Sequence, residues 1–377
     1  MKKEELKCLC LSDIHLNHKR NSTEDIIKNL VIFFKEYDYK GSLDIIFIAG
    51  DLFDSLMDFP ANSVTEITVF VKWLLNLCCK NDIKLRILEG TPSHDWRQSK
   101  IFNTIAMVSE LPVDLKYVDT LYIEYMDDLG IHILYVPDEW NHSTDKTYQQ
   151  VKELLDREHI DKVDLAIMHG QFAYQLPSHV EKCPKHIESN YLSIVRHYIC
   201  IGHVHISSVY ERILAQGSFD RLSHNEESPK GAMYFIIRNN NTREHYFIEN
   251  KNAKTFKTIT CKSKDIEFNL KYIEKQTKGL RTDSYVRIKA SKDNPILLSI
   301  DEVKKRFPFF NMSKVSFEEE LESNQTELIS ENDNQVYTAI NIDRENIISM
   351  LMDVVNNKYN PTELMKDIML KELGGVL

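Results

Sequence analysis

Residues 6–15 read LKCLCLSDIH, an apolar run that ends in an aspartate and a histidine. Residues 44–54 follow the same design as DIIFIAGDLFD, in which apolar residues lead directly into Gly50 and Asp51. Short apolar and β-branched runs bounded by polar or turn residues are typical of buried strands. Both segments are therefore predicted to be strands, each with a polar and potentially functional loop at its carboxyl end.

The same pattern recurs through the first half of the chain. It predicts further strands at residues 84–88, 131–136, 164–168 and 198–201. Apolar residues at helical spacing predict helices at residues 23–37, 64–80 and 147–159. Alternating strands and helices predict an α/β fold whose sheet is covered by helices on both faces. Strands at residues 208–214, 231–237 and 244–249 would complete a main domain over residues 1–252.

The rest of the chain divides into three further predicted parts. Residues 253–320 are predicted to form a small α+β domain. Residues 322–335 are acidic and contain no aromatic residue, which predicts a solvated linker over residues 321–341. Residues 342–377 recover helical periodicity and predict two short amphipathic helices. Such helices cannot bury their apolar stripes alone, so they either pack on the body of the protein or bind a partner.

Composition excludes several classes of protein. No apolar run reaches the roughly 18 residues that span a bilayer. We therefore expect the protein not to associate with a membrane and to be located in the cytoplasm. Seven cysteines without metal-binding spacing are expected to be reduced and structural. The net charge of -10 argues against a broadly basic surface for duplex DNA. Bound divalent cations would nevertheless reverse the sign of the field around an acidic site.

Five polar clusters follow predicted strands and contain five of the fourteen histidines. In chain order they contain Asp13 with His15, Asp51, His94 with Asp95, His169, and His203 with His205. A single histidine is more often a satisfied surface or core residue than a ligand. The ordered set favours two divalent cations, because carboxylates and imidazoles together suit manganese, with iron or zinc as alternatives. Two such cations would clamp a phosphate and activate water.

These clusters resemble the pattern DxH, GDxxD, GNHD, H and GHxH of the calcineurin-like metallophosphoesterase superfamily. The resemblance covers residues 6–210 and implies an α/β sandwich with helices on both faces. It also implies two cation sites, with the ligands Asp13, His15 and His205 for one, His169 and His203 for the other, and Asp51 as the bridge. His94 would protonate the leaving oxygen, a task that suits histidine because it titrates near neutral pH, and Asp95 would be its partner.

The third cluster departs from the superfamily pattern. Where the family has Asn in GNHD, this chain reads GTPSHD, and alignment on His94 and Asp95 places Ser93 at the asparagine position. By this alignment Ser93 is the candidate ligand of the second cation. Because a hydroxyl is usually a poorer metal ligand than an amide carbonyl, a water or a backbone oxygen is the alternative.

A narrower resemblance follows at residues 216–231, QGSFDRLSHNEESPKG. This segment is similar to one in the SbcD nuclease family, which includes the nuclease subunit of the MRN repair complex and phage counterparts. The resemblance implies a DNA exonuclease and endonuclease in repair or recombination that uses Mn²⁺, with Mg²⁺ as the alternative. It further implies a capping domain, a homodimer, and C-terminal helices that bind an SbcC-type, SMC-like ATPase.

Two other functions stay open on the sequence alone. The same metals would serve a metallophosphatase or a cyclic-nucleotide phosphodiesterase, which need neither a capping domain nor partner helices. The change at Ser93 could also mark a catalytically weak scaffold that binds DNA ends. In the nuclease family, some members carry histidine three residues after the bridging aspartate, where this chain has Asp54.

Overall fold

The computed structural model describes residues 1–319 apart from 20, 37–42, 58–61, 139–142 and 177–182. The predicted linker at 321–341 and the predicted helices at 342–377 lie outside the described residues. By its internal contacts the chain divides into Met1–Lys314 and Val315–Leu377. The boundary predicted at residue 252 therefore stays a prediction.

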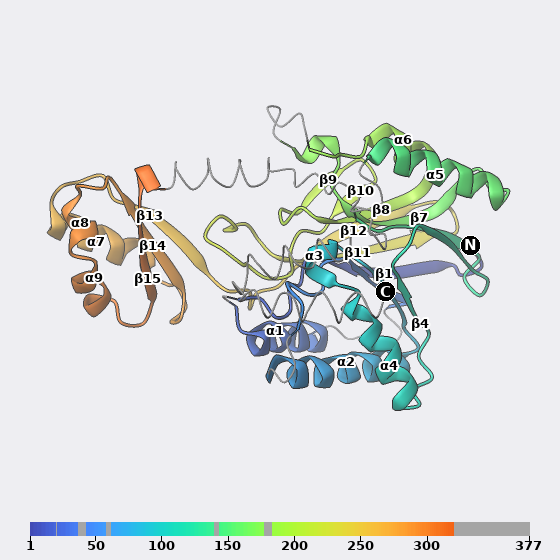
Figure 1. Ribbon diagram of the computed structural model, residues 1–377, viewed down its shortest axis with the longest axis horizontal. Coiled ribbons are helices and arrows are strands. Elements are labelled where there is room, and N and C mark those ends of the chain that lie inside the picture. The colour runs from blue at the N-terminus through green and yellow to red at the C-terminus, as the bar shows by residue number, and fades with distance from the viewer. Residues whose placement is uncertain (20, 37–42, 58–61, 139–142, 177–182, 320–377) are drawn as a thin grey trace, which may run out of the picture. The chain divides into compact units, whose positions relative to one another are not determined.

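Two six-stranded mixed sheets form most of the first unit (Figure 1). The first has the order β12-β11-β1-β2-β3-β4, with β1 (Glu5–Leu11), β2 (Ile45–Ala49), β3 (Lys84–Leu88), β4 (Leu115–Val118), β11 (Gly231–Arg238) and β12 (Arg243–Glu249). The second has the order β5-β6-β7-β8-β10-β9, with β5 (Tyr122–Met126), β6 (Ile131–Val136), β7 (Val163–Gly170), β8 (Val195–His203), β9 (Ser208–Tyr210) and β10 (Ile213–Ala215). Strands β1 to β4 run parallel, as do β6, β7, β8 and β10.

The two sheets pack face to face, and strand β1 shows how the sequence achieves this. Its alternate residues Leu6, Cys8 and Cys10 belong to a core shared with residues of β6, β7 and β8. Its other face buries Leu9 and Leu11 in a second core beneath helices. Successive side chains of a strand point to opposite faces, so a run that is apolar at all but its first positions supplies both cores.

Helices flank the outer face of each sheet (Figure 1). The first sheet is covered by α1 (Thr23–Glu36), α2 (Asn62–Asn81) and α4 (Ile101–Val108), and the second by α5 (Thr144–Arg157) and α6 (Glu188–Ile194). Short helical turns lie at α3 (Pro92–Asp95), Gln98–Lys100 and Ala173–Gln175. The architecture is thus an α/β sandwich with helices on both outer faces, as expected.

The segment after β12 has a hydrophobic core of its own, which includes Ile259, Ile273, Val286 and Val303. It contains β13 (Phe256–Thr260), α7 (Ile266–Thr277), β14 (Tyr285–Ala290), α8 (Pro295–Leu298), α9 (Ile300–Arg306) and β15 (Asn311–Ser316). The three strands form one sheet in the order β13-β14-β15. This content agrees with the small α+β module expected there.

Two other expectations can be compared with the structure. All seven cysteines are free, as predicted. No helix within the described residues is long and apolar enough to cross a membrane.

Candidate metal centre

The predicted ligands stand where parallel strands end. Asp13 and His15 follow β1, Asp51 follows β2, His169 lies at the end of β7, and His203 is the last residue of β8. The carboxyl ends of neighbouring parallel strands meet at one edge of a sheet, and the two sheets are packed together. Side chains that are distant in the sequence are thereby brought to one place.

The backbone of the first two loops is held in an uncommon conformation. Asp13, His15 and Asp51 have φ angles of 50°, 54° and 50°, in the left-handed region that costs ordinary residues energy. Hydrogen bonds compensate, since the Asp13 amide donates to the Gly50 carbonyl over 3.1 Å and the His15 amide to the Asp51 carbonyl over 3.1 Å. A Cβ atom at Gly90 would lie 2.1 Å from the Asp51 amide nitrogen, so glycine is required there.

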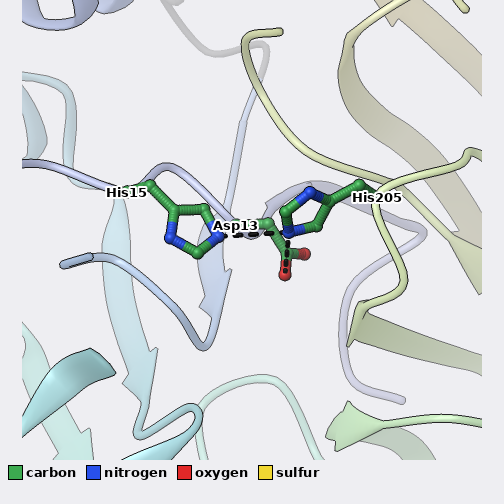
Figure 2. Close-up of side chains that lie close together, drawn as sticks. All are labelled: Asp13, His15 and His205. Carbon is green, nitrogen blue, oxygen red and sulfur yellow. Dashed lines mark hydrogen bonds and ion pairs between the residues drawn. The ribbon is translucent and has the colours of Figure 1, made fainter. Parts of the chain in front are cut away.

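Asp13, His15 and His205 form the first of the groups that could hold a cation (Figure 2). The Nε2 atoms of the two histidines are 3.1 Å apart, and His205 Nε2 is 3.7 Å from Asp13 Oδ1. The other ring nitrogens face carboxylates, with His15 Nδ1 3.3 Å from Asp54 and His205 Nδ1 3.1 Å from Glu226. Metal-binding histidines commonly have such a carboxylate partner, which orients the ring and makes the ligand nitrogen more basic.

Asp51, His169 and His203 form a second such group. His169 Nε2 is 3.2 Å from Asp51 Oδ1, while His169 Nδ1 donates to the Ala49 carbonyl over 2.7 Å. Burial disfavours the charged form of both side chains. The opposite charge of the partner outweighs burial, so the pKa of His169 is raised and that of Asp51 is lowered. A cation bound here would take the place of the imidazole proton.

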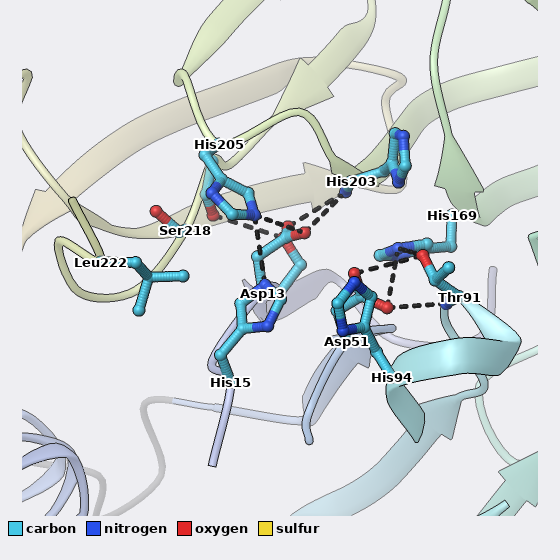
Figure 3. A network of polar contacts seen from close by, with 12 residues as sticks. Asp13, His15, Asp51, Thr91, His94, His169, His203, His205, Ser218 and Leu222 are labelled. Carbon is cyan, nitrogen blue, oxygen red and sulfur yellow. Dashed lines mark hydrogen bonds and ion pairs between the residues drawn. The ribbon is translucent and has the colours of Figure 1, made fainter. Parts of the chain in front are cut away.

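Both groups open into one pocket of about 320 Å³ (Figure 3). Its lining residues are His15, His18, Asp51, Asp54, His94, His203, His205, Leu222, Ser223 and Glu226. Predicted ligands from separate loops therefore face a common space, while Asp13 and His169, one from each group, are fully buried and do not line it. The carboxylates and imidazoles present are of the kind that bind divalent cations such as Mn²⁺, and His15, Asp54 and His94 form a third group that could hold a cation, which shares His15 with the first. The bridging role of Asp51 stays a prediction.

The residues 216–231 that carry the narrower resemblance lie against the first group. The buried Lys230 ammonium donates to Ser218 Oγ and to the His205 carbonyl, both over 2.8 Å, and is 2.9 Å from Glu226 Oε2. Burial would raise the pKa of Glu226, but His205 and Lys230 hold it at about 2. The segment therefore positions His205 and supplies its carboxylate partner.

The structure corrects the partner predicted for His94. His94 Nδ1 is 2.7 Å from the Asp54 carbonyl oxygen, and because a carbonyl only accepts, Nδ1 must carry a proton. Asp95 instead accepts hydrogen bonds from the backbone amides of Asp51, Phe53 and Gly90, over 3.1, 2.9 and 2.7 Å. The prediction that Asp95 assists His94 is wrong. Asp95 ties the loops after β2 and β3 together.

Replacing Asp95 by alanine is expected to lower the free energy of unfolding by about 3 kcal/mol, because three buried amides would lose their acceptor. Urea denaturation monitored by circular dichroism measures this change. Asp95→Asn keeps one acceptor oxygen and should be less destabilised. A loss below about 1 kcal/mol in Asp95→Ala would contradict the structural role.

The structure also corrects the position of Ser93. Ser93 is exposed, and its carbonyl accepts from the Trp96 indole over 2.8 Å. Thr91, two residues earlier, is the residue that reaches the second group: its amide donates to Asp51 Oδ1 over 2.6 Å. The two extra residues of GTPSHD form the start of α3, which carries Ser93 away from the ligands.

Comparisons with known proteins add little. No family model matches the chain, and no curated protein matches it. Among solved structures, TT1561 of Thermus thermophilus is 10% identical, with 64% of this chain and 98% of that chain covered and a TM-score of 0.37. GAP50, the anchor in the inner membrane complex of Plasmodium, is 14% identical, with 67% and 87% covered and a TM-score of 0.37. Likenesses this distant carry no argument about fold or function.

Proposed function

We propose that the chain is a metal-dependent DNA nuclease with exonuclease and endonuclease activity, which works at DNA ends with an SbcC-type ATPase. The observation that carries the proposal is the convergence of two cation-binding groups on one pocket that also contains His94. A pair of cation sites beside a general acid is an arrangement that catalyses phosphoester hydrolysis. The choice of DNA as substrate rests on the resemblance of residues 216–231 to the SbcD family.

Each part of the site has a defined task in this proposal. Asp13, His15 and His205 would hold one divalent cation, and Asp51, His169 and His203 the other. Bound divalent cations supply positive charge that offsets the phosphodiester and acidify water.

The acid would be His94. Its Nδ1 proton is held by the Asp54 carbonyl, so the proton delivered to the leaving oxygen would come from Nε2 of the charged ring.

A nuclease assay on linear DNA tests the proposal. The full chain should cut single- or double-stranded linear DNA in Mn²⁺ or Mg²⁺ and lose this activity when EDTA removes the ions. Addition of an SbcC-type ATPase should stimulate cleavage, and deletion of residues 347–377 should abolish the stimulation while sparing basal hydrolysis. Hydrolysis of phosphomonoesters or cyclic nucleotides, with none of DNA, would overturn the choice of substrate. No hydrolysis of any of them would favour the scaffold.

A further inference from the structure

The hydroxyl of Thr91 lies within hydrogen-bonding distance of three polar atoms, and Figure 3 shows two of the residues that carry them, Asp51 and His169. Thr91 Oγ1 is 3.3 Å from Asp51 Oδ2, 3.3 Å from Asp138 Oδ2 and 3.5 Å from His169 Nε2. A hydroxyl has one proton to donate, so it cannot satisfy both carboxylates. Two carboxylates and an imidazole thus converge on one buried hydroxyl, and carboxylates and imidazoles are ligand types that Mn²⁺ takes in proteins.

Asp138 reaches this place from a strand that carries none of the predicted ligands. It follows β6, whose Val136 pairs with Met168 of β7, and this register places Asp138 beside the end of β7. Asp138 Oδ2 is 3.8 Å from His203 Nδ1, and only 16% of the side chain is exposed. Asp138 thus lies beside His203, and the Thr91 hydroxyl lies within 3.3 Å of both Asp138 and Asp51.

We propose that Asp138 is a further ligand of the second cation, beside Asp51, His169 and His203. This inference rests on the proposed two-cation function. Two neutral imidazoles and one carboxylate leave half of the charge of a divalent cation unbalanced, and more than half if Asp51 is shared with the first ion. A second carboxylate corrects this, and a set of two imidazoles and two carboxylates suits Mn²⁺.

Thr91 has a positioning role in this arrangement. Its amide holds Asp51 Oδ1 over 2.6 Å, while its hydroxyl reaches Asp138 Oδ2 over 3.3 Å. One residue therefore sets the separation of the two carboxylates. The exposed Ser93 of the same loop is the matched control, because it carries the same functional group and contacts neither carboxylate.

Direct measurement of Mn²⁺ binding tests the assignment without reference to activity. Calorimetric titration of the full chain should give two ions per chain for the wild type and for Ser93→Ala. In Asp138→Asn the second ion should bind at least about tenfold more weakly, a loss of about 1.4 kcal/mol, with the first ion unchanged. Thr91→Val should weaken the same ion by a smaller factor.

The outcomes separate this inference from the proposed function. Two ions of unchanged affinity in Asp138→Asn would overturn the role of Asp138 and leave the two-cation centre intact. Equal weakening of both ions would also overturn it, because the assignment is to the second ion alone. A wild-type protein that binds fewer than two ions would instead contradict the two-cation centre on which the proposed function depends.

Discussion

Asp51→Asn is expected to reduce DNA hydrolysis in Mn²⁺ by at least about 1000-fold, equivalent to about 4 kcal/mol of transition-state stabilisation. Asparagine has nearly the same shape and can still accept the 2.6 Å hydrogen bond from the Thr91 amide. It lacks the negative charge that faces His169 and, in the proposed function, both cations. The expected loss is therefore electrostatic rather than structural.

Turnover of linear DNA at saturating Mn²⁺ measures this effect, and circular dichroism checks that the variant is folded. Asp127→Asn is the matched control, because it makes the same change at a side chain that is 82% exposed and paired with Lys2. The control should keep wild-type turnover. Asp51→Asn with more than about a tenth of wild-type turnover would show that Asp51 holds no catalytic ion.

Much of the fold could be predicted because its central strands are buried on both faces. A strand of this kind reads as a mostly apolar run, and residues 84–88 and 131–136 match the observed β3 and β6. The apolar pattern alone did not reveal that the strands divide between two sheets, which only the resemblance to the superfamily implied. That division depends on which strands pair, and pairing is decided by contacts between segments far apart in the chain.

Elements with exposed residues escaped prediction. Strands β4 and β5 are only partly buried and lie at the edges of their sheets, so they lack the apolar pattern. Residues 208–214 were expected to form one strand, but they form the hairpin of β9 and β10. The turn between these strands includes Glu211, whose φ of 49° is uncommon for this residue type.

In the candidate site too, residues marked by a pattern in the nearby sequence could be predicted, whereas residues placed by the fold could not. Asp13, His15, Asp51 and His203 could be predicted as neighbours, because each follows or ends a parallel strand. Asp138 also follows a strand, but a single aspartate in a loop gives no signal of its own. Ser93 was misplaced because alignment on His94 ignored the two-residue insertion. Only the observed start of α3 shows that Thr91 reaches the ligands.

His94→Gln is expected to lower turnover on DNA by about 100- to 10,000-fold, the range typical of removing a general acid. Glutamine keeps a donor for the Asp54 carbonyl but cannot deliver a proton at neutral pH. The His94 ring lies edge-on to His15, with centroids 5.2 Å apart. His94 is in neither ligand set of the proposed function, although it forms a third group that could hold a cation with His15 and Asp54. In the proposed function the Mn²⁺ affinity of the two sites should therefore change little, which separates this variant from Asp51→Asn.

A change of leaving group turns the His94 prediction into a test of proton transfer. A p-nitrophenyl phosphodiester releases an oxygen that needs no proton, whereas DNA releases an alkoxide that does. His94→Gln should therefore lose much less turnover on the p-nitrophenyl substrate than on DNA. Equal losses on the two substrates would mean that His94 positions the phosphate or a neighbouring ligand, and that the acid must be sought elsewhere in the pocket.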